Sequence, residues 1–239
     1  MLVEIWSDVV CPWCFIGKRR FESALKEFAH RDEVEVIYRS FELDPSAPEV
    51  GVESISAALG RKYGGTPEQV TEMMGTVSAL AAAEGLRFDY ENVTHTNTID
   101  AHRLLHLALD VGGLDLQAKL KEALLSAYFE AGRSMGDREV LTDVAVSAGL
   151  DPARVAEVLD SEEYADGVGG DLRQAFEFGI QGVPFYVFDR QLAVSGAQAP
   201  EAFAQALDQA YSAETPTLGV LADGTVCGPD GCALEDQSA

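Results

Sequence analysis

Two cysteines separated by two residues stand where a short strand pattern changes into a helical pattern near the start of the chain. The sequence Cys-Pro-Trp-Cys at residues 11–14 follows an alternating segment at 2–6 and precedes a helical segment. Because a helix N-terminus stabilises negative charge, a thiol held there loses its proton more easily than a free thiol. A second thiol one turn away can resolve the mixed disulfide that the first one forms. The spacing therefore predicts a pair for disulfide exchange, with Cys11 as the attacking thiol.

The first forty residues predict two strands joined by a helix. Residues 2–6 alternate as a strand with one face in the core, and residues 34–39 alternate again with β-branched and aromatic side chains. Between them, apolar residues recur at roughly helical spacing from residue 16 to 29. Strand, helix and strand within about forty residues form a βαβ unit, so we expect parallel strands and a right-handed crossover.

The middle of the chain, from about residue 50 to 178, has the periodicity of helices. Thr66 and Pro67 predict the start of one helix, as N-cap and first helical residue, and Gly85 fits its end. Further helices are expected at residues 97–112, 116–131, 139–148, 152–159 and 171–178. This part of the chain is therefore predicted to be a helical module.

Strand patterns return after the helical module. Residues 184–188 and 192–194 predict a hairpin with a turn at residues 189–190, and residues 200–211 predict an amphipathic helix. The order is thus βαβ, a helical insertion, and then ββα. The expected organisation is a discontinuous α/β domain at 1–45 and 180–213, a helical insertion domain at 46–179, and a C-terminal tail at 214–239.

Several ordered motifs add a family resemblance to this pattern. A βαβ unit with Cys-x-x-Cys at its strand–helix junction, completed by ββα, resembles the thioredoxin fold. An all-helical insertion between the halves is similar to the DsbA family within that fold. The closer motifs are Ser7-Asp8 before the cysteines and the segments at 97–103, 182–185 and 194–198. Together they resemble the FrnE-like branch of cytoplasmic DsbA-type oxidoreductases over about residues 2–212.

This resemblance implies roles for Cys11, Cys14 and Pro184, beside which Val183 and Trp13 are candidate substrate-binding residues. Cys11 is expected to be the exposed nucleophile and Cys14 the resolving thiol. Pro184 falls at the position of the family's cis-proline, which faces the redox pair, and Val183 beside it can offer backbone polar groups to an extended substrate. Trp13 is expected to be exposed, and both contact with apolar substrate and simple packing stay open for it.

A second pair, Cys227 and Cys232, lies in the tail outside the resemblance. Turn residues at 229–231 favour bringing the two sulfurs together. A structural disulfide over so short a loop would contribute only about 2 kcal/mol, so a second redox pair is the preferred interpretation. The alternatives are an inert tail and a zinc site that combines these cysteines with Cys11 and Cys14. No metal is expected at the redox pair.

Other charged and imidazole side chains have simpler interpretations. His102 lies on a strongly apolar helix, where a lone histidine is usually a core residue with satisfied hydrogen bonds. Lys18, Arg19 and Arg20 follow Cys14 by about a turn. A solvated helix face is the preferred interpretation for them, over stabilisation of a thiolate or binding of an acidic partner.

Composition limits the partners of the chain. It has 40 acidic and 17 basic residues and a formal net charge of −23, which argues against nucleic acid and against an anionic membrane surface. Residues 1–10 show no signal peptide, and no stretch approaches the ~18 apolar residues of a membrane span. We therefore expect a cytoplasmic protein, where structural disulfides are scarce. No cofactor is expected, and the oligomeric state stays open.

The leading hypothesis is a thiol–disulfide oxidoreductase that acts on protein or small-molecule substrates containing disulfides or thiols. The alternative is a glutathione-dependent isomerase or transferase of the 2-hydroxychromene-2-carboxylate isomerase or kappa class. Those enzymes resemble this chain without a redox cysteine pair and generally present a serine to the glutathione sulfur. Residues 195–198 also lack the acidic residue expected to hold the glutathione amino group. A non-catalytic chaperone or scaffold is the third possibility.

Overall fold

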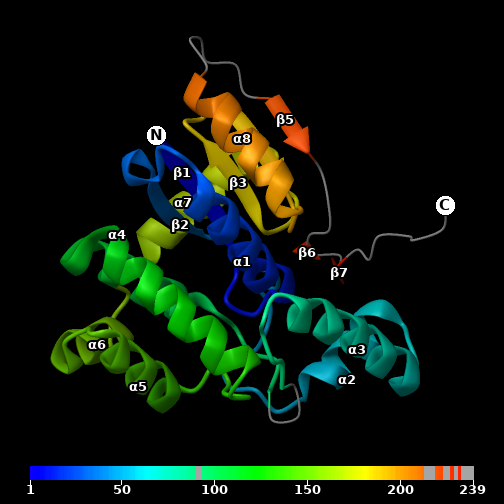
Figure 1. The fold of residues 1–239 in the computed structure, drawn as a ribbon. Helices are drawn as coiled ribbons and strands as arrows, with labels where there is room; N and C mark the ends of the chain where they lie inside the picture. Colours follow the sequence, from blue (N-terminus) through cyan, green and yellow to red (C-terminus); the bar gives the residue numbers. More distant parts are fainter. Residues whose placement is uncertain (90–92, 213–218, 223–226, 229–230, 233–239) are drawn as a thin grey trace.

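A mixed β-sheet lies in the upper half of the molecule as drawn in Figure 1. The computed structural model describes residues 1–89 and 93–212 together with short strands at 219–222, 227–228 and 231–232. The sheet has the strand order β2-β1-β3-β4-β5. Its strands are β1 (Leu2–Ser7), β2 (Glu35–Ser40), β3 (Phe185–Phe188), β4 (Leu192–Ser195) and β5 (Gly219–Ala222). β1 pairs in parallel with β2 and antiparallel with β3, which confirms the predicted thioredoxin fold.

One face of the sheet is covered by helices α1 (Pro12–Glu27) and α8 (Pro200–Ser212). Phe21 of α1 and Phe203 of α8 meet edge to face, with ring centroids 5.7 Å apart, and both rings contact Tyr186 of β3. Aromatic pairs of this kind bury large apolar areas and prefer such edge contacts. They hold α8 and α1, which begins with the redox motif, in fixed positions on the sheet.

β1 is buried on both faces, so the prediction of one core face was wrong. Trp6 donates from Nε1 to the Asp171 carbonyl, at 3.0 Å, and is fully buried. Glu4 is 1% exposed and accepts hydrogen bonds from Arg39 at 2.7 Å and Arg190 at 2.9 Å. The alternation of the sequence shows one apolar face. It does not show that helix α7 (Ala165–Glu177) and paired arginines cover the polar face.

The helical insertion lies between β2 and β3, and the 3-10 turn η1 (Arg31–Glu33) precedes β2. The helices of the insertion are α2 (Ile55–Tyr63), α3 (Pro67–Ala83), α4 (Ile99–Phe129), α5 (Arg138–Ala148), α6 (Pro152–Leu159) and α7 (Ala165–Glu177). α3 begins as predicted, because Thr66 and Gln69 form a reciprocal capping box. α7 begins at Ala165, earlier than the predicted 171. The glycines at 169 and 170 weaken the helical pattern of the sequence, but the helix includes them.

α4 joins the two helices predicted at 97–112 and 116–131. A break remains between them at Gly113, whose φ of 68° and ψ of −163° lie in a region that is essentially restricted to glycine. The two halves therefore remain distinct helical segments, as the sequence predicted. His102 lies on the first half and Lys121 on the second.

The tail adds a strand to the edge of the sheet. β5 pairs in parallel with β4. Beyond it, β6 (Cys227–Gly228) and β7 (Gly231–Cys232) pair antiparallel, with Cys227 opposite Cys232. Residues 229 and 230 of the predicted turn lie outside the described residues. None of the helices in the described ranges combines the length and apolar character needed to cross a membrane.

Candidate active site

Helix α1 places the two cysteines of the redox motif. Cys11 is its N-cap residue and Pro12 its first helical residue, where the missing proline N–H leaves no hydrogen bond unmade. The first turn contains no acidic residue, and no side chain caps the helix N-terminus. Negative charge on the Cys11 sulfur is therefore stabilised by the end of the helix. Both cysteines are free thiols, and the Cys14 N–H donates to the Cys11 carbonyl at 3.1 Å.

The loop before β3 brings the other predicted residues to Cys11. The Val183–Pro184 peptide is cis, as the sequence predicted. The Cys11 thiol donates to the Val183 carbonyl, with the sulfur 3.5 Å from the oxygen. On α1, a Cβ atom at Gly17 would lie 3.1 Å from Pro184 Cγ. The first turns of α1 and the proline loop are therefore packed directly against each other.

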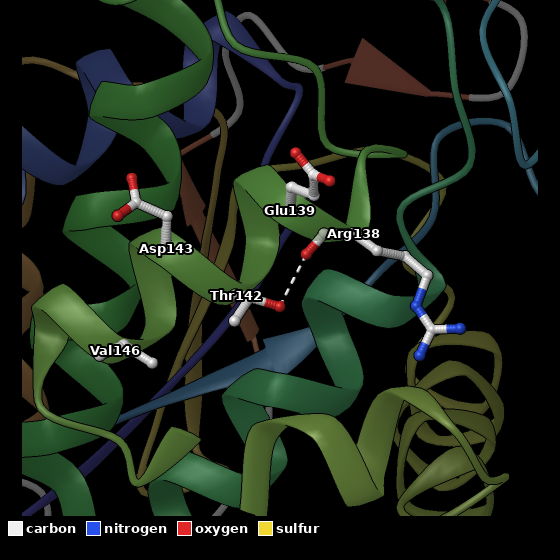
Figure 2. A pocket seen from close by; sticks show the side chains of 5 residues that line it. All are labelled: Arg138, Glu139, Thr142, Asp143 and Val146. Carbon is white, nitrogen blue, oxygen red and sulfur yellow. Dashed lines mark hydrogen bonds between the residues drawn. The ribbon is translucent and has the colours of Figure 1, made fainter. Parts of the chain in front are cut away.

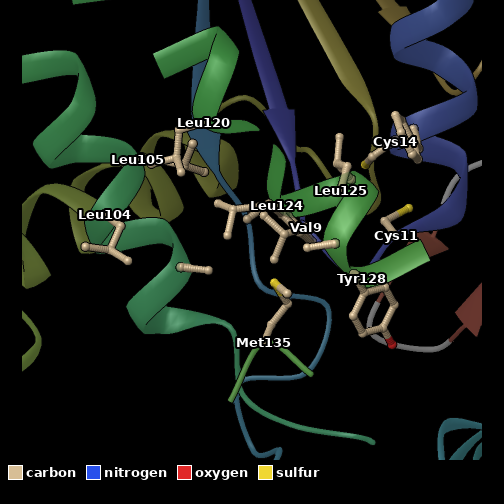
Figure 3. Packing of buried hydrophobic residues seen from close by; sticks show 14 of the residues in the cluster. Val9, Cys11, Cys14, Leu104, Leu105, Leu120, Leu124, Leu125, Tyr128 and Met135 are labelled. Atoms are coloured by element: carbon tan, nitrogen blue, oxygen red, sulfur yellow. The ribbon is translucent and has the colours of Figure 1, made fainter. Parts of the chain in front are cut away.

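The predicted exposure of Cys11 was wrong. Cys11 is 0% exposed and Cys14 is 3% exposed. Figure 3 shows both in one buried cluster with Val9 and with Leu125 and Tyr128 of α4. The helical insertion thus completes a core around the pair, which no pattern within α1 can reveal.

Trp13 is also buried, at 3% exposure, and belongs to the same cluster. The expectation that it is exposed was therefore wrong. Its indole Nε1 has no hydrogen-bond partner in the described part of the chain. The burial agrees with the packing interpretation that the sequence left open for this side chain.

Asp8 connects the redox motif to the helical insertion. It is 1% exposed, and its carboxylate lies 3.3 Å from His102 Nε2 and accepts the Leu43 N–H at 2.8 Å. Burial alone would raise the pKa of Asp8. The hydrogen bond and charge of His102, the Leu43 N–H and the charge of Lys121 outweigh burial and lower that pKa. His102 is thus a core residue as predicted, but its hydrogen bonds are only partly satisfied, because Nδ1 has no partner among the described residues while Nε2 contacts Asp8.

Lys121 is a buried cation that the sequence interpretation missed. Its side chain is 1% exposed, and Nζ donates to the Ser7 carbonyl at 3.4 Å. Burial lowers its pKa to about 8, although the charges of Cys14 and Asp8 act in the opposite direction. A signal was present, because helical spacing puts residue 121 on the same stripe as Leu124, Leu125 and Tyr128.

Burial raises the pKa of the Cys14 thiol well above its usual range, and the hydrogen bond and charge of Cys11 add to this effect. The charge of Lys121 and the N–H of Asp8 act in the opposite direction. Cys14 is therefore held as a neutral thiol in the resting site. This condition suits a resolving group that reacts second.

The three basic residues after Cys14 do not form a solvated face, so that expectation was wrong. Lys18 is 6% exposed, and its Nζ lies 2.6 Å from a carboxylate oxygen of Glu122 on α4. Arg19 also pairs with Glu122, and Arg20 pairs with Glu84 at 2.6 Å. Lys18 and Arg19 also pair with Glu22 within α1. Glu122 and Glu84 lie 103 and 64 residues away from their arginine partners in sequence, so these pairs attach α1 to the insertion.

A separate shallow hollow of about 430 Å³ lies on α5 (Figure 2). It is lined by Arg138, Glu139, Thr142, Asp143 and Val146. None of the predicted site residues belongs to it. Among the described residues, no three His, Cys, Asp or Glu side chains could hold a metal ion. The zinc alternative depends on the tail cysteines, whose side chains lie outside the described part.

The chain matches the family model of the DSBA-like thioredoxin domain over residues 2–208. The chain belongs to this family. A curated relative, the uncharacterized protein YwbO of Bacillus subtilis, is 27% identical over 208 residues, which cover 86% of this chain and 94% of the relative. The family assignment thus agrees with the fold and with the redox motif.

Two solved structures extend the comparison of this DsbA-like chain. A probable DsbA oxidoreductase from Streptomyces coelicolor is 47% identical, with a TM-score of 0.85 and coverage of 98% of this chain and 99% of that one. A 2-hydroxychromene-2-carboxylate isomerase is 12% identical, with a TM-score of 0.64 and coverage of 87% and 95%, and shares the fold. The activity class is therefore a disulfide oxidoreductase or a related enzyme. The FrnE-like assignment stays a prediction.

Proposed function

We propose that the protein is a thiol–disulfide oxidoreductase that uses Cys11 and Cys14 to exchange disulfides with protein or small-molecule substrates. The observation that carries this proposal is the position of two free thiols in the first turn of α1, with the Cys11 sulfur 3.5 Å from the Val183 carbonyl. In the reducing direction, the Cys11 thiolate attacks one substrate sulfur and releases the other as a thiolate. Cys14 then attacks Cys11 and releases the second substrate sulfur, so two electrons pass to the substrate.

The Val183–Pro184 loop is the proposed substrate platform. The Val183 carbonyl accepts the Cys11 thiol hydrogen in the resting protein. That hydrogen is absent once Cys11 is in a mixed disulfide, so the carbonyl becomes available to a backbone N–H of an extended substrate. The burial of Trp13 favours a packing role for this side chain over direct substrate contact.

Serine substitutions test the two roles separately, in a Cys227→Ser/Cys232→Ser background that removes the tail thiols. Cys11→Ser is expected to abolish reduction of oxidised glutathione and of a disulfide-containing peptide. Cys14→Ser is expected to keep the first step and to accumulate a mixed disulfide at Cys11, visible by mass spectrometry of the intact protein. Full turnover in Cys11→Ser would contradict the proposal.

The glutathione-dependent alternative predicts another result. An isomerase of that class should isomerise 2-hydroxychromene-2-carboxylate with glutathione, and that activity should survive in Cys11→Ser. We favour the oxidoreductase because those isomerases are expected to lack a redox cysteine pair, whereas this chain has two free thiols in the first turn of α1.

We further propose that Cys227 and Cys232 are a second redox pair that exchanges electrons with Cys11 and Cys14. The two residues are direct partners in the β6–β7 ladder. Antiparallel partners have Cα atoms about 4.5–5.5 Å apart, within the range that a disulfide can bridge. In the cytoplasm, where we expect the protein, a purely structural bridge is disfavoured.

The tail pair is tested by trapping. A Cys14→Ser variant is expected to form an internal disulfide between Cys11 and a tail cysteine, and the added Cys227→Ser/Cys232→Ser change should remove it. Peptide mapping under non-reducing conditions identifies the linkage. Stoichiometric zinc in the freshly purified protein, or equal turnover with and without the tail cysteines, would argue against the exchange.

A further inference from the structure

The loop that carries Pro184 is held at two successive carbonyl groups. The Val183 carbonyl accepts the Cys11 thiol, and the Pro184 carbonyl accepts the Gly196 N–H at 2.9 Å. β3 and β4 pair antiparallel up to this point, and Gly196 is the first residue after β4. The position of the proposed substrate platform therefore depends on residues 196–199, the β4–α8 loop.

Arg20 of α1 binds this loop directly. Its Nη1 donates to the Ala197 carbonyl at 2.7 Å, and its Nε donates to the Glu84 carboxylate at 2.6 Å. Arg20 comes one turn after Gly17, where a Cβ atom would lie 3.3 Å from Ala197 Cα, so the helix and the loop are in close contact there. Because a guanidinium holds its donors in a fixed plane, the bond to Glu84 limits the directions in which Arg20 can face Ala197.

Glu84 connects this arrangement to the helical insertion. It is the C-cap residue of α3, and its side chain is 22% exposed, against 20% for Arg20. A hydrogen bond between an ionised donor and a carboxylate is about twice as strong as one between neutral groups. One guanidinium thus joins α3, α1 and the β4–α8 loop. The proposed chemistry at the two cysteines does not itself use this side chain.

We propose that Arg20 is a positioning residue for polypeptide substrates. Through Ala197 and Gly196 it fixes the Val183–Pro184 loop, and through Glu84 it lets the helical insertion control how well an extended peptide binds beside Cys11. This inference rests on the proposed function. The substrate class it favours is a disulfide within a polypeptide, because a disulfide without peptide groups has no backbone N–H to donate to the Val183 carbonyl.

Loss of the Arg20 side chain should therefore affect two kinds of substrate differently. The Ala197 carbonyl would lose a charge-assisted hydrogen bond, and the β4–α8 loop would gain freedom. The Val183 carbonyl would then be held less well in the position that a peptide requires. Cys11 is fixed by its own place as the N-cap residue of α1, so a small disulfide should depend much less on Arg20.

An Arg20→Met substitution tests this in a background with Cys14, Cys227 and Cys232 replaced by serine, where exchange stops at the mixed disulfide on Cys11. Mass spectrometry of the intact protein follows its formation with an unstructured peptide that contains one disulfide, and with bis(2-hydroxyethyl) disulfide. At low substrate concentration, the second-order rate constant for the peptide is expected to fall about tenfold relative to that for the small disulfide, the equivalent of one charge-assisted hydrogen bond.

The ratio of the two rate constants separates positioning from general damage. A loosened site, or a change in the Cys11 thiolate, alters both rate constants together. An unchanged ratio in a folded Arg20→Met variant would therefore overturn the proposal. If Cys11 is not the nucleophile, the parent protein of this background forms no adduct with either substrate, so failure of the proposed function is recognised separately.

The control variant is Arg61→Met, which breaks an exposed pair with Glu53 on α2 and should leave the ratio unchanged. Arg20→Lys keeps a charged donor for the Ala197 carbonyl and is expected to restore part of the peptide rate. If circular dichroism shows that Arg20→Met is unfolded, Glu84→Gln takes its place. It should lower the ratio about threefold, because a neutral amide holds the guanidinium less firmly. An unchanged ratio in folded Glu84→Gln would then overturn the proposal.

Discussion

At Gly17, helix α1 passes so close to the neighbouring strand that a Cβ atom would lie 2.6 Å from the Tyr186 hydroxyl. It would also lie 3.1 Å from Pro184 Cγ and 3.3 Å from Ala197 Cα. The Tyr186 hydroxyl is buried without a hydrogen-bond partner among the described residues. The absence of a side chain at residue 17 therefore sets the separation between the redox helix and the proline loop.

We expect Gly17→Ala to lower the free energy of unfolding by about 1–3 kcal/mol, because overpacking forces the helix or the loop to move. The control is Gly75→Ala in α3, where a Cβ would meet nothing within 4 Å. That change should stabilise the protein by up to about 1 kcal/mol through helix propensity. Urea unfolding measures both. Adding Tyr186→Phe should restore part of the loss at Gly17, and stabilisation by Gly17→Ala alone would contradict this account.

At the scale of elements, helix α4 shows what a single sequence can reveal and what it cannot. The two apolar segments at 97–112 and 116–131 predicted its halves, and Gly113 marks the break between them. Periodicity identifies a buried stripe but not the element that packs on it. For this reason Cys11, Cys14 and the Val183–Pro184 loop could be predicted from local motifs. The packing of Tyr128 in the same buried cluster as the cysteines, and the buried position of Lys121, could not.

Lys121 is expected to make the stability of the protein rise with pH. Folding lowers its pKa from the usual 10.5 to about 8, so the unfolded chain binds this proton more tightly than the folded chain. The cost at neutral pH is about 3 kcal/mol, and it is relieved as pH rises from about 8 towards 10.5. Lys121→Met should therefore be more stable than the parent protein near neutral pH and should lose this rise. Urea unfolding between pH 7 and 10.5 measures the unfolding free energy of both proteins, with Lys119→Met as control. If the free energy of Lys121→Met rises with pH as steeply as that of the parent protein, the assignment is refuted.

At the scale of the whole molecule, ion pairs connect the thioredoxin part to the helical insertion. Glu122 of α4 pairs with Lys18 at 2.6 Å and with Arg19, both on α1. The Lys18 side chain is only 7% exposed and lies within ion-pair distance of Glu22 and Glu122. These contacts hold the insertion over the redox pair.

Glu122→Gln is expected to lower the free energy of unfolding by about 1–3 kcal/mol, because it leaves a buried cation with less compensation. The matched change is Glu157→Gln, which breaks an exposed pair with Arg154 within α6. It should cost less than about 0.5 kcal/mol. Thermal unfolding of the two variants in low salt gives the comparison, and equal effects would show that Glu122 is no more than a surface pair.

The full burial of Cys11 has a kinetic consequence. A reagent or substrate reaches the Cys11 sulfur only while the buried cluster around it, which includes Leu125 and Tyr128, is transiently open. At low concentration the reaction rate grows with concentration, and at high concentration it levels off at the frequency of opening. Reagents of very different intrinsic reactivity should then reach one common plateau. That plateau is the ceiling on turnover, however nucleophilic the thiolate is.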